Sequence, residues 1–281
     1  MNYRHLFHAG NFADVLKHGA LALLIEALKA KDKPFAVFDT HAGRGAYDLM
    51  SDEAQRNPEF RGGIAKVLAA DGARLKALGP YLDLVRRLND GQPALRHYPG
   101  SPLIAQGLMR ADDRLILVEK HPEEFAALRR AMGRDARVHL HEGDGYERIE
   151  ALLPPAERRG LVLIDPPFEI RDEFDHFVRA LVRSHRRFPA GVFMGWYPIK
   201  APAAIAAFHG ALKEAGLRRL VALEVMIQAP RDPARLNGNG LVIVNPPFAA
   251  RADLEALPRL LAPIVGTGQG AVGKFTELVG E

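Results

Sequence analysis

The residues with the clearest chemical potential lie in segment 161–168, which reads LVLIDPPF. Four apolar residues of strand type end at Asp165, because the two prolines that follow cannot extend a strand. The Asp165 carboxylate and the Pro166 carbonyl can together accept both hydrogens of an exocyclic amine. The Phe168 ring can stack on the face of the base that carries this amine. The segment therefore predicts a site for a planar, amino-bearing base.

Three other strand candidates also end in or near an acid, at Asp39, Glu119 and Asp144. In an open parallel α/β sheet, ligands bind at the carboxyl ends of the strands, and all these ends lie on one edge. An acid after the second strand is well placed to accept hydrogen bonds from a pair of ribose hydroxyls. We therefore expect these acids to share one site with Asp165. The three strand candidates are 35–39, 114–118 and 137–140.

The loop after the first strand candidate contains Gly43 and Gly45, which allow a ligand to approach the backbone closely. It lacks the GxGxxG spacing of a dinucleotide site. A ligand without a pyrophosphate fits it better.

Cations, histidines and an aromatic ring crowd the start of the first helix, which Asn11 is expected to cap. An ordinary solvated helix start is one interpretation of this group, and a metal site at His5, His8 and His18 is another. The metal site is disfavoured, because neither an HExxH-type spacing nor a carboxylate partner accompanies the histidines. A substrate-facing arm is favoured if a nucleic acid binds nearby. The group comprises Tyr3, Arg4, His5, His8, Lys17 and His18.

Composition excludes several classes of protein. The 281 residues are 48% hydrophobic, and 38 Lys and Arg against 34 Asp and Glu give a net charge of +4. This is mildly basic and compatible with a polyanionic partner. The absence of cysteine excludes disulfides, thiolate zinc sites and a cysteine nucleophile. Because no run is long and apolar enough to cross a bilayer, and no signal peptide is recognisable, we expect a soluble, cytoplasmic protein without a membrane partner.

A helical segment interrupts the alternation of strands and helices. Residues 49–99 have helical periodicity and no strand candidate, so we divide the chain into 1–48, a helical insertion at 49–99, and 100–281. Beyond the insertion, Ser101 is expected to cap a helix that has Pro102 at its first position. Basic residues of the insertion could form a phosphate-binding face, or simply a solvated helix surface. They are Lys66, Arg74, Lys76, Arg86 and Arg87.

A second copy of the motif, LVIVNPPF at 241–248, comes after two further helices and two further strands. The functional copy should follow the acid of the third strand after one helix, and Asp165 does so whereas Asn245 does not. We interpret 245–248 as a structural turn at the last strand. The remaining elements expected are helices at 173–187 and 202–215 and strands at 191–196, 218–227 and 241–244.

Seven strand candidates in this order resemble the class I S-adenosylmethionine methyltransferase fold, a mostly parallel sheet whose last strand is usually antiparallel. In this resemblance Asp39, Gly43 and Gly45 correspond to the cofactor loop, with His41 where a glycine is customary. Glu119 corresponds to the ribose-binding acid and Asp144 to the acid near the adenine amine. Segment 165–168 corresponds to the (Asp/Asn)-Pro-Pro-aromatic signature of amino-group methyltransferases.

The whole chain also resembles the bacterial RlmJ family, which methylates N6 of an adenine in 23S ribosomal RNA. The motifs that carry this are YRHxFHAGNxADVLKH at 3–18, then DTHAGxG, YPGSPLIA and LIDPPF, in that order. The resemblance implies an S-adenosylmethionine-dependent enzyme, with 23S ribosomal RNA as its partner, no metal, and a catalytic group of Asp165, Pro166 and Phe168. Implied cofactor contacts are Lys17, His18, Asp39, His41, Gly43, Ser101, Glu119, Gly143, Asp144 and Asp165. Implied RNA contacts are Tyr3, Arg4, His5 and Phe168.

Two other functions stay open from the sequence. The same fold could methylate a DNA adenine or a protein amide, and a chain with a vestigial site could serve as a non-catalytic RNA-binding protein. We expect a monomer.

Overall fold

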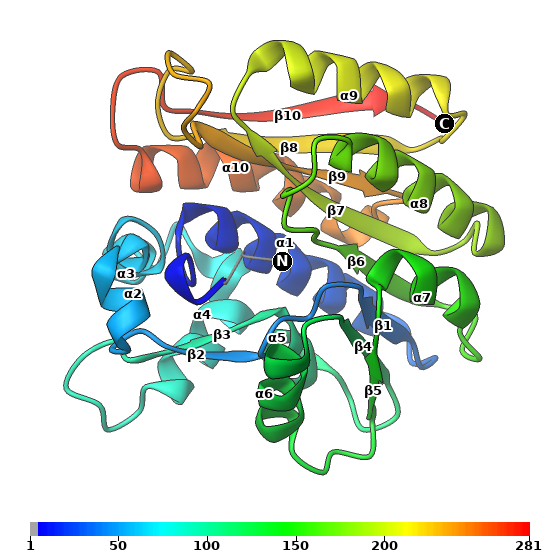
Figure 1. The fold of residues 1–281 in the computed structure, drawn as a ribbon, viewed down its shortest axis with the longest axis horizontal. Coiled ribbons are helices and arrows are strands. Elements are labelled where there is room, and N and C mark those ends of the chain that lie inside the picture. Colours follow the sequence, from blue (N-terminus) through cyan, green and yellow to red (C-terminus); the bar gives the residue numbers. More distant parts are fainter. Residues whose placement is uncertain (1–4) are drawn as a thin grey trace.

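The computed structural model describes residues 5–281, and the predicted Tyr3 and Arg4 contacts therefore lie outside the described residues. A mixed sheet forms the centre of the molecule, with helices on both faces (Figure 1). The strand order within the described residues is β10-β8-β9-β7-β6-β1-β4-β5. The strands are β1 (Ala36–Asp39), β4 (Arg114–Glu119), β5 (Val138–Glu142), β6 (Gly160–Ile164), β7 (Val192–Ile199), β8 (Leu220–Met226), β9 (Gly238–Val244) and β10 (Val272–Val279).

The centre of this sheet is parallel. β1 pairs in parallel with β4 and β6, while β5 and β7 extend the parallel part on either side. β9 runs antiparallel to both β7 and β8. All seven predicted strands are confirmed, and so is the antiparallel orientation of the seventh.

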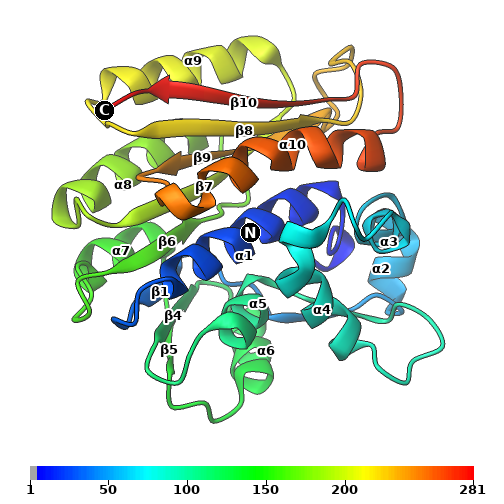
Figure 2. The same ribbon diagram turned by 180° about the vertical axis from the view of Figure 1, so that it is seen from behind.

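Two helical layers cover the sheet, as the opposite views of Figures 1 and 2 show. One core contains side chains of α1, α5 and α10, and the other contains side chains of α7, α8 and α9. α1 lies across the sheet in the middle of its layer (Figure 2). Asn11 caps α1 as predicted, because its side chain accepts hydrogen bonds from the amides of Ala13 and Asp14. The bounds are α1 (Phe12–Lys29), α5 (Ser101–Leu108), α6 (Pro122–Met132), α7 (Gly145–Leu152), α8 (Glu173–Arg187), α9 (Pro202–Glu214) and α10 (Arg251–Val265).

The sheet is larger than predicted at its β10 edge. β10 is an eighth strand that pairs antiparallel with β8. β9 also begins three residues before the predicted start, at Gly238. Packing explains the glycine at position 240 of this strand. A Cβ on Gly240 would lie 2.2 Å from the Tyr197 ring of the paired strand.

Between β1 and α5 the chain forms short helices framed by two short strands. β2 (Ala46–Asp48) and β3 (His97–Pro99) pair antiparallel at the two ends of this segment. The helices are α2 (Asp52–Arg56), α3 (Ile64–Ala69) and α4 (Gly79–Leu88). Buried side chains of this segment, including Ile64, Tyr81 and Val85, join the same core as α1. The division at 49 and 99 stays a prediction.

Several basic side chains of this segment have partners within the molecule. Lys66 donates to the Gly266 carbonyl, while Arg74 and Arg86 each pair with an aspartate three residues earlier. These contacts favour an ordinary solvated surface for the helices over a dedicated phosphate-binding face.

The close packing at Gly240 gives a testable prediction. Gly240→Ala should destabilise the protein by about 1–3 kcal/mol, because the added methyl group overpacks the site of the Tyr197 ring. Gly210→Ala in α9 is the matched control, since a Cβ there meets nothing within 4 Å. It should be neutral or stabilise by about 0.5–1 kcal/mol. Equal urea midpoints for the two variants would contradict the packing account.

Candidate active site

A cavity of about 380 Å³ opens at the carboxyl edge of the parallel strands. Asp165, which follows β6, lines it together with Pro166, and so do Glu119 at the end of β4 and Asp144 after β5. Lys17 and His18 of α1 line it as well. The structure therefore brings together predicted residues from six distant segments of the chain. Predicted residues among the lining are His5, Lys17, His18, His41, Gly43, Ser101, Glu119, Asp144, Asp165 and Pro166.

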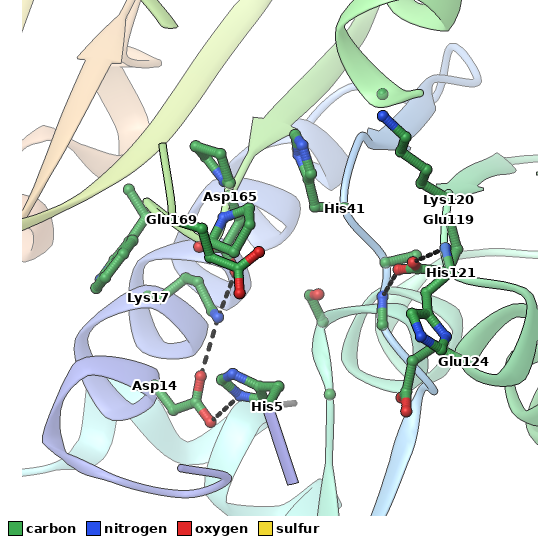
Figure 3. Close-up of a pocket in the computed structure, with 18 of the residues that line it drawn as sticks. His5, Asp14, Lys17, His41, Glu119, Lys120, His121, Glu124, Asp165 and Glu169 are labelled. Atoms are coloured by element: carbon green, nitrogen blue, oxygen red, sulfur yellow. Dashed lines mark hydrogen bonds and ion pairs between the residues drawn. The ribbon is translucent and has the colours of Figure 1, made fainter. Parts of the chain in front are cut away.

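The Asp165 carboxylate is held by a buried lysine (Figure 3). Lys17 Nζ lies 2.6 Å from Asp165 Oδ2 and 2.9 Å from Asp14 Oδ1, and the Lys17 side chain is only 6% exposed. Burial alone lowers the pKa of Lys17, but the two carboxylates outweigh it and raise that pKa well above its usual value. Among the described residues no hydrogen bond engages Asp165 Oδ1, which leaves this oxygen for a ligand.

Asp14 is the second carboxylate of this group. Its Oδ2 accepts hydrogen bonds from His5 Nε2 at 2.9 Å and from the Gly10 amide at 2.8 Å. Burial raises the pKa of Asp14, yet the charges of His5 and Lys17 outweigh this and hold the pKa well below its usual range. The sequence placed Asp14 only in the first turn of a helix. Its spacing of three residues from Lys17, on the same helix face, is the signal that could have assigned it to the site.

The three histidines near this helix start do not converge on one point. His5 pairs with Asp14, His8 Nδ1 lies 3.0 Å from Glu59 Oε2, and His18 Nδ1 lies 2.6 Å from the Tyr98 hydroxyl. Burial lowers the pKa of His18 to about 3, so its ring is neutral at physiological pH. Among the described residues His18 Nε2 has no hydrogen-bond partner, and His18 lines the cavity.

Glu119 lies on the other side of the cavity (Figure 3). It meets the backbone of Gly43 there. Glu119 Oε2 accepts from the Gly43 amide at 2.8 Å, and Oε1 accepts from the His121 amide at 2.7 Å. Each oxygen keeps a further lone pair for a ligand hydroxyl. Gly43 has a φ of 62°, and a Cβ there would lie 2.7 Å from the Tyr47 hydroxyl, so the position requires glycine.

Asp144 caps α7 as well as lining the cavity. Its Oδ1 accepts from the Tyr146 amide at 3.0 Å, and its Oδ2 accepts from Lys120 Nζ at 2.9 Å. The preceding Gly143, a predicted cofactor contact, has a φ of 145° and is not among the lining residues. His41 lies at the rim of the same region, with its ring 5.2 Å from the Tyr146 ring in an edge-on arrangement. Burial lowers the pKa of His41 to about 4.

Two predicted residues have positions that differ from expectation. Ser101 does not cap α5, because the helix begins at Ser101 itself and Gly100 is the capping residue. The Ser101 hydroxyl instead donates to Asp39 Oδ2 at 2.6 Å. Asp39 is therefore a buried support beneath the cavity and not one of its lining residues.

Phe168 is also absent from the lining of the cavity. It adopts a φ of 51°, and its ring packs edge-on against Phe174 at 4.9 Å and Trp196 at 5.7 Å. Trp196, which the sequence assigned only to a strand, does line the cavity. Stacking of a base on Phe168 stays a prediction.

The second motif copy lies at the opposite edge of the sheet. Val244, the last residue of β9, pairs with Phe193 and Leu220 near the starts of β7 and β8. Asn245 adopts a φ of 55° and donates to the carbonyls of Pro189 and Gly191. The interpretation of 245–248 as a structural turn is confirmed.

The strand order and the acid-lined cavity at the carboxyl edge define a class I methyltransferase. Among the described residues, no helix is long and apolar enough to cross a bilayer.

Comparison with known proteins identifies the family. Residues 32–274 match the family described as Ribosomal RNA large subunit methyltransferase D, RlmJ. The chain is 40% identical to Ribosomal RNA large subunit methyltransferase J of Escherichia coli (strain K12) over 274 residues, which cover 96% of each chain. It is 38% identical to the protein of that name from Haemophilus influenzae over 277 residues, again 96% of each chain. A crystal structure of a Legionella pneumophila protein is similar as well, with a TM-score of 0.85, 33% identity, and coverage of 96% of this chain and 97% of that chain. The chain thus belongs to the RlmJ family of ribosomal RNA large subunit methyltransferases.

The buried Asp39 gives a pH-dependent prediction. Burial raises the pKa of Asp39 from 3.8 to about 7, although the Ser101 hydroxyl favours the ionised form. The folded state therefore binds this proton more tightly than the unfolded state does. The contribution of Asp39 to the free energy of unfolding should fall as the pH rises from about 4 to about 7. Asp39→Asn, measured by urea denaturation across this window, should remove that part of the slope; an unchanged slope would contradict it.

Proposed function

We propose that this enzyme transfers the methyl group of S-adenosylmethionine to N6 of an adenine in 23S ribosomal RNA, giving N6-methyladenine. The observation that carries the proposal is the position of Asp165 in the cavity, with one carboxylate oxygen bound to Lys17 and the other open to a ligand. An acid followed by two prolines at this strand end suits an amine substrate. The names of the curated relatives support ribosomal RNA as the molecule that carries this amine.

The residues of the cavity fit S-adenosylmethionine. Its volume of about 380 Å³ lies within the range of roughly 300–1,000 Å³ of small-molecule sites. Glu119 can accept hydrogen bonds from the ribose hydroxyls, and the Gly43 backbone permits close approach of the ligand. His18 Nε2, buried and without a partner among the described residues, can hydrogen-bond the bound molecule. When bound, the cofactor supplies a methyl group activated by a sulfonium.

The chain contributes orientation and charge to the reaction. An adenine amine is a poor nucleophile, because its lone pair is delocalised into the ring. Hydrogen bonds from this amine to Asp165 Oδ1 and to the Pro166 carbonyl would favour a tetrahedral nitrogen and hold it in line for attack. Lys17 contributes by holding the carboxylate that follows β6 in place through its ammonium group.

The Asp165 carboxylate is also the candidate acceptor for the proton that must leave. A carboxylate is a weak base. A weak base suffices here, because the amine is strongly acidic while it carries both the new methyl group and a positive charge. Asp165 can therefore accept the proton during or after methyl transfer.

The target adenine has to leave its helix to reach the cavity. Unstacking a base costs a few kcal/mol, and stacking on an aromatic side chain in the pocket would return about 1–3 kcal/mol. The enzyme should therefore prefer a target adenine that lies in a loop or is weakly paired, because such a base costs less to unstack.

Incubation with tritiated S-adenosylmethionine and transcribed 23S ribosomal RNA fragments, followed by nucleoside analysis, tests the proposal. We expect label in N6-methyladenosine from one fragment. Label in duplex DNA or protein with none in RNA would instead support the same fold acting on another amine. A failure of calorimetry to detect cofactor binding would support a non-catalytic RNA-binding protein.

Asp165→Ala should lower the rate of methyl transfer by about 100-fold or more, because the methyl side chain removes both the hydrogen-bond acceptor for the amine and the acceptor for the proton. The dissociation constant of S-adenosylmethionine should change little. Asn245→Ala makes the same change at the equivalent residue of the second motif at the opposite sheet edge and is the matched control, with turnover expected at the wild-type level. Wild-type turnover by Asp165→Ala would refute the assigned role.

A further inference from the structure

The part of the cavity beyond Asp165 has different neighbours from the part beside Glu119. Glu119 ends β4, while Gly43 and Asp144 follow β1 and β5, and these three strands lie on one side of β6 in the sheet. β7 lies on the other side of β6 and contributes Trp196 to the lining. If the cofactor occupies the side of Glu119, an amine held by Asp165 belongs to a base on the side of β7. Pro166, Pro167, Ile170 and Trp196 contribute apolar groups to the lining, alongside the polar side chains of Glu169, Glu173 and His176.

Trp196 is fixed in place by its neighbours. Its indole Nε1 donates to Asn239 Oδ1 at 3.3 Å, across the pairing of β7 with β9. Asn239 is a residue of β9 and is fully buried, so the hydrogen-bond acceptor is itself shielded from water. The Phe168 ring packs against Trp196 at an interplanar angle of 74° and rests in turn on Phe174. An aromatic side chain held on two sides loses little conformational freedom when a ligand stacks on it.

We infer that Trp196 is the aromatic surface on which the target adenine stacks, with Asn239 and Phe168 as its supports. This inference rests on the proposed function and refines it, because it moves the stacking role from Phe168, which is not among the lining residues, to Trp196, which is. Asn239 is a positioning residue, since it acts on the base only through the indole. The ligand at this end of the cavity is a purine base presented by RNA.

Kinetic measurements can distinguish a loss of base stacking at Trp196 from a loss of cofactor binding. Trp196→Leu should raise KM for a transcribed 23S ribosomal RNA fragment about 10-fold or more, the loss expected for one stacked base, and leave S-adenosylmethionine affinity within about twofold. Trp196→Phe should recover most of the loss. Phe248→Leu is the matched control, because this aromatic residue of the second motif is 93% exposed at the opposite sheet edge. An unchanged KM for Trp196→Leu overturns the inference, as does a parallel loss of cofactor affinity.

Fluorescence provides a second readout, because Trp196 is the only tryptophan in the 281 residues. With S-adenosylhomocysteine present at saturation, the RNA fragment that accepts methyl groups should quench the emission. RNA that binds without quenching overturns the inference. Asn239→Leu should shift the emission maximum and raise KM less than Trp196→Leu does, with kcat unchanged. A spectrum and KM identical to wild type would remove Asn239 from the account.

These outcomes are distinguishable from failure of the proposed function. If wild-type enzyme transfers no methyl group to RNA, the proposed function fails. If wild-type enzyme methylates RNA and Trp196→Leu does so with unchanged KM, only the stacking assignment fails.

Discussion

One buried ammonium group, that of Lys17, links helix α1 to the carboxylate that follows β6 in the active site. Lys17 Nζ of α1 pairs at once with Asp14 on its own helix and with Asp165 at the end of β6. Asp165 lies 148 residues from Lys17 in the sequence. All three side chains are largely excluded from water. Removing one partner of such a group leaves a buried charge and costs about 3–5 kcal/mol. The position of the Asp165 carboxylate therefore depends on the docking of α1 across the sheet.

The topology of the sheet explains why strand ends from distant parts of the sequence meet in one cavity. Parallel pairing of β5, β4, β1, β6 and β7 brings their carboxyl ends to one edge, and the cavity opens there. The antiparallel direction of β9 sends a nearly identical sequence to the opposite edge, where Asn245 binds backbone carbonyls and serves a turn. Two nearly identical sequences thus have different consequences because the directions of their strands differ.

Much of this arrangement could be predicted from sequence. Buried parallel strands are continuous apolar runs, so β1, β4 and β6 were recognisable, and the acids at their ends marked the site. β10 escaped prediction because an edge strand with partly exposed, alternating residues lacks such a run. The exchange of a helix cap for the Ser101–Asp39 hydrogen bond depends on tertiary contact, which local spacing cannot reveal. Likewise, the separation of Phe168 from the cavity follows from its backbone conformation and its packing on Phe174 and Trp196.

The most direct test of the central claim concerns the charge on Lys17. Single-turnover methyl transfer to 23S ribosomal RNA should be about 10- to 100-fold slower in Lys17→Met, because Asp165 loses the ion that fixes its acceptor geometry. Lys17→Arg, which retains the positive charge, should recover part of the rate. Thermal unfolding should first establish that both variants are folded under the assay conditions. A rate at the wild-type level in Lys17→Met would contradict the claim that this ion pair organises the site.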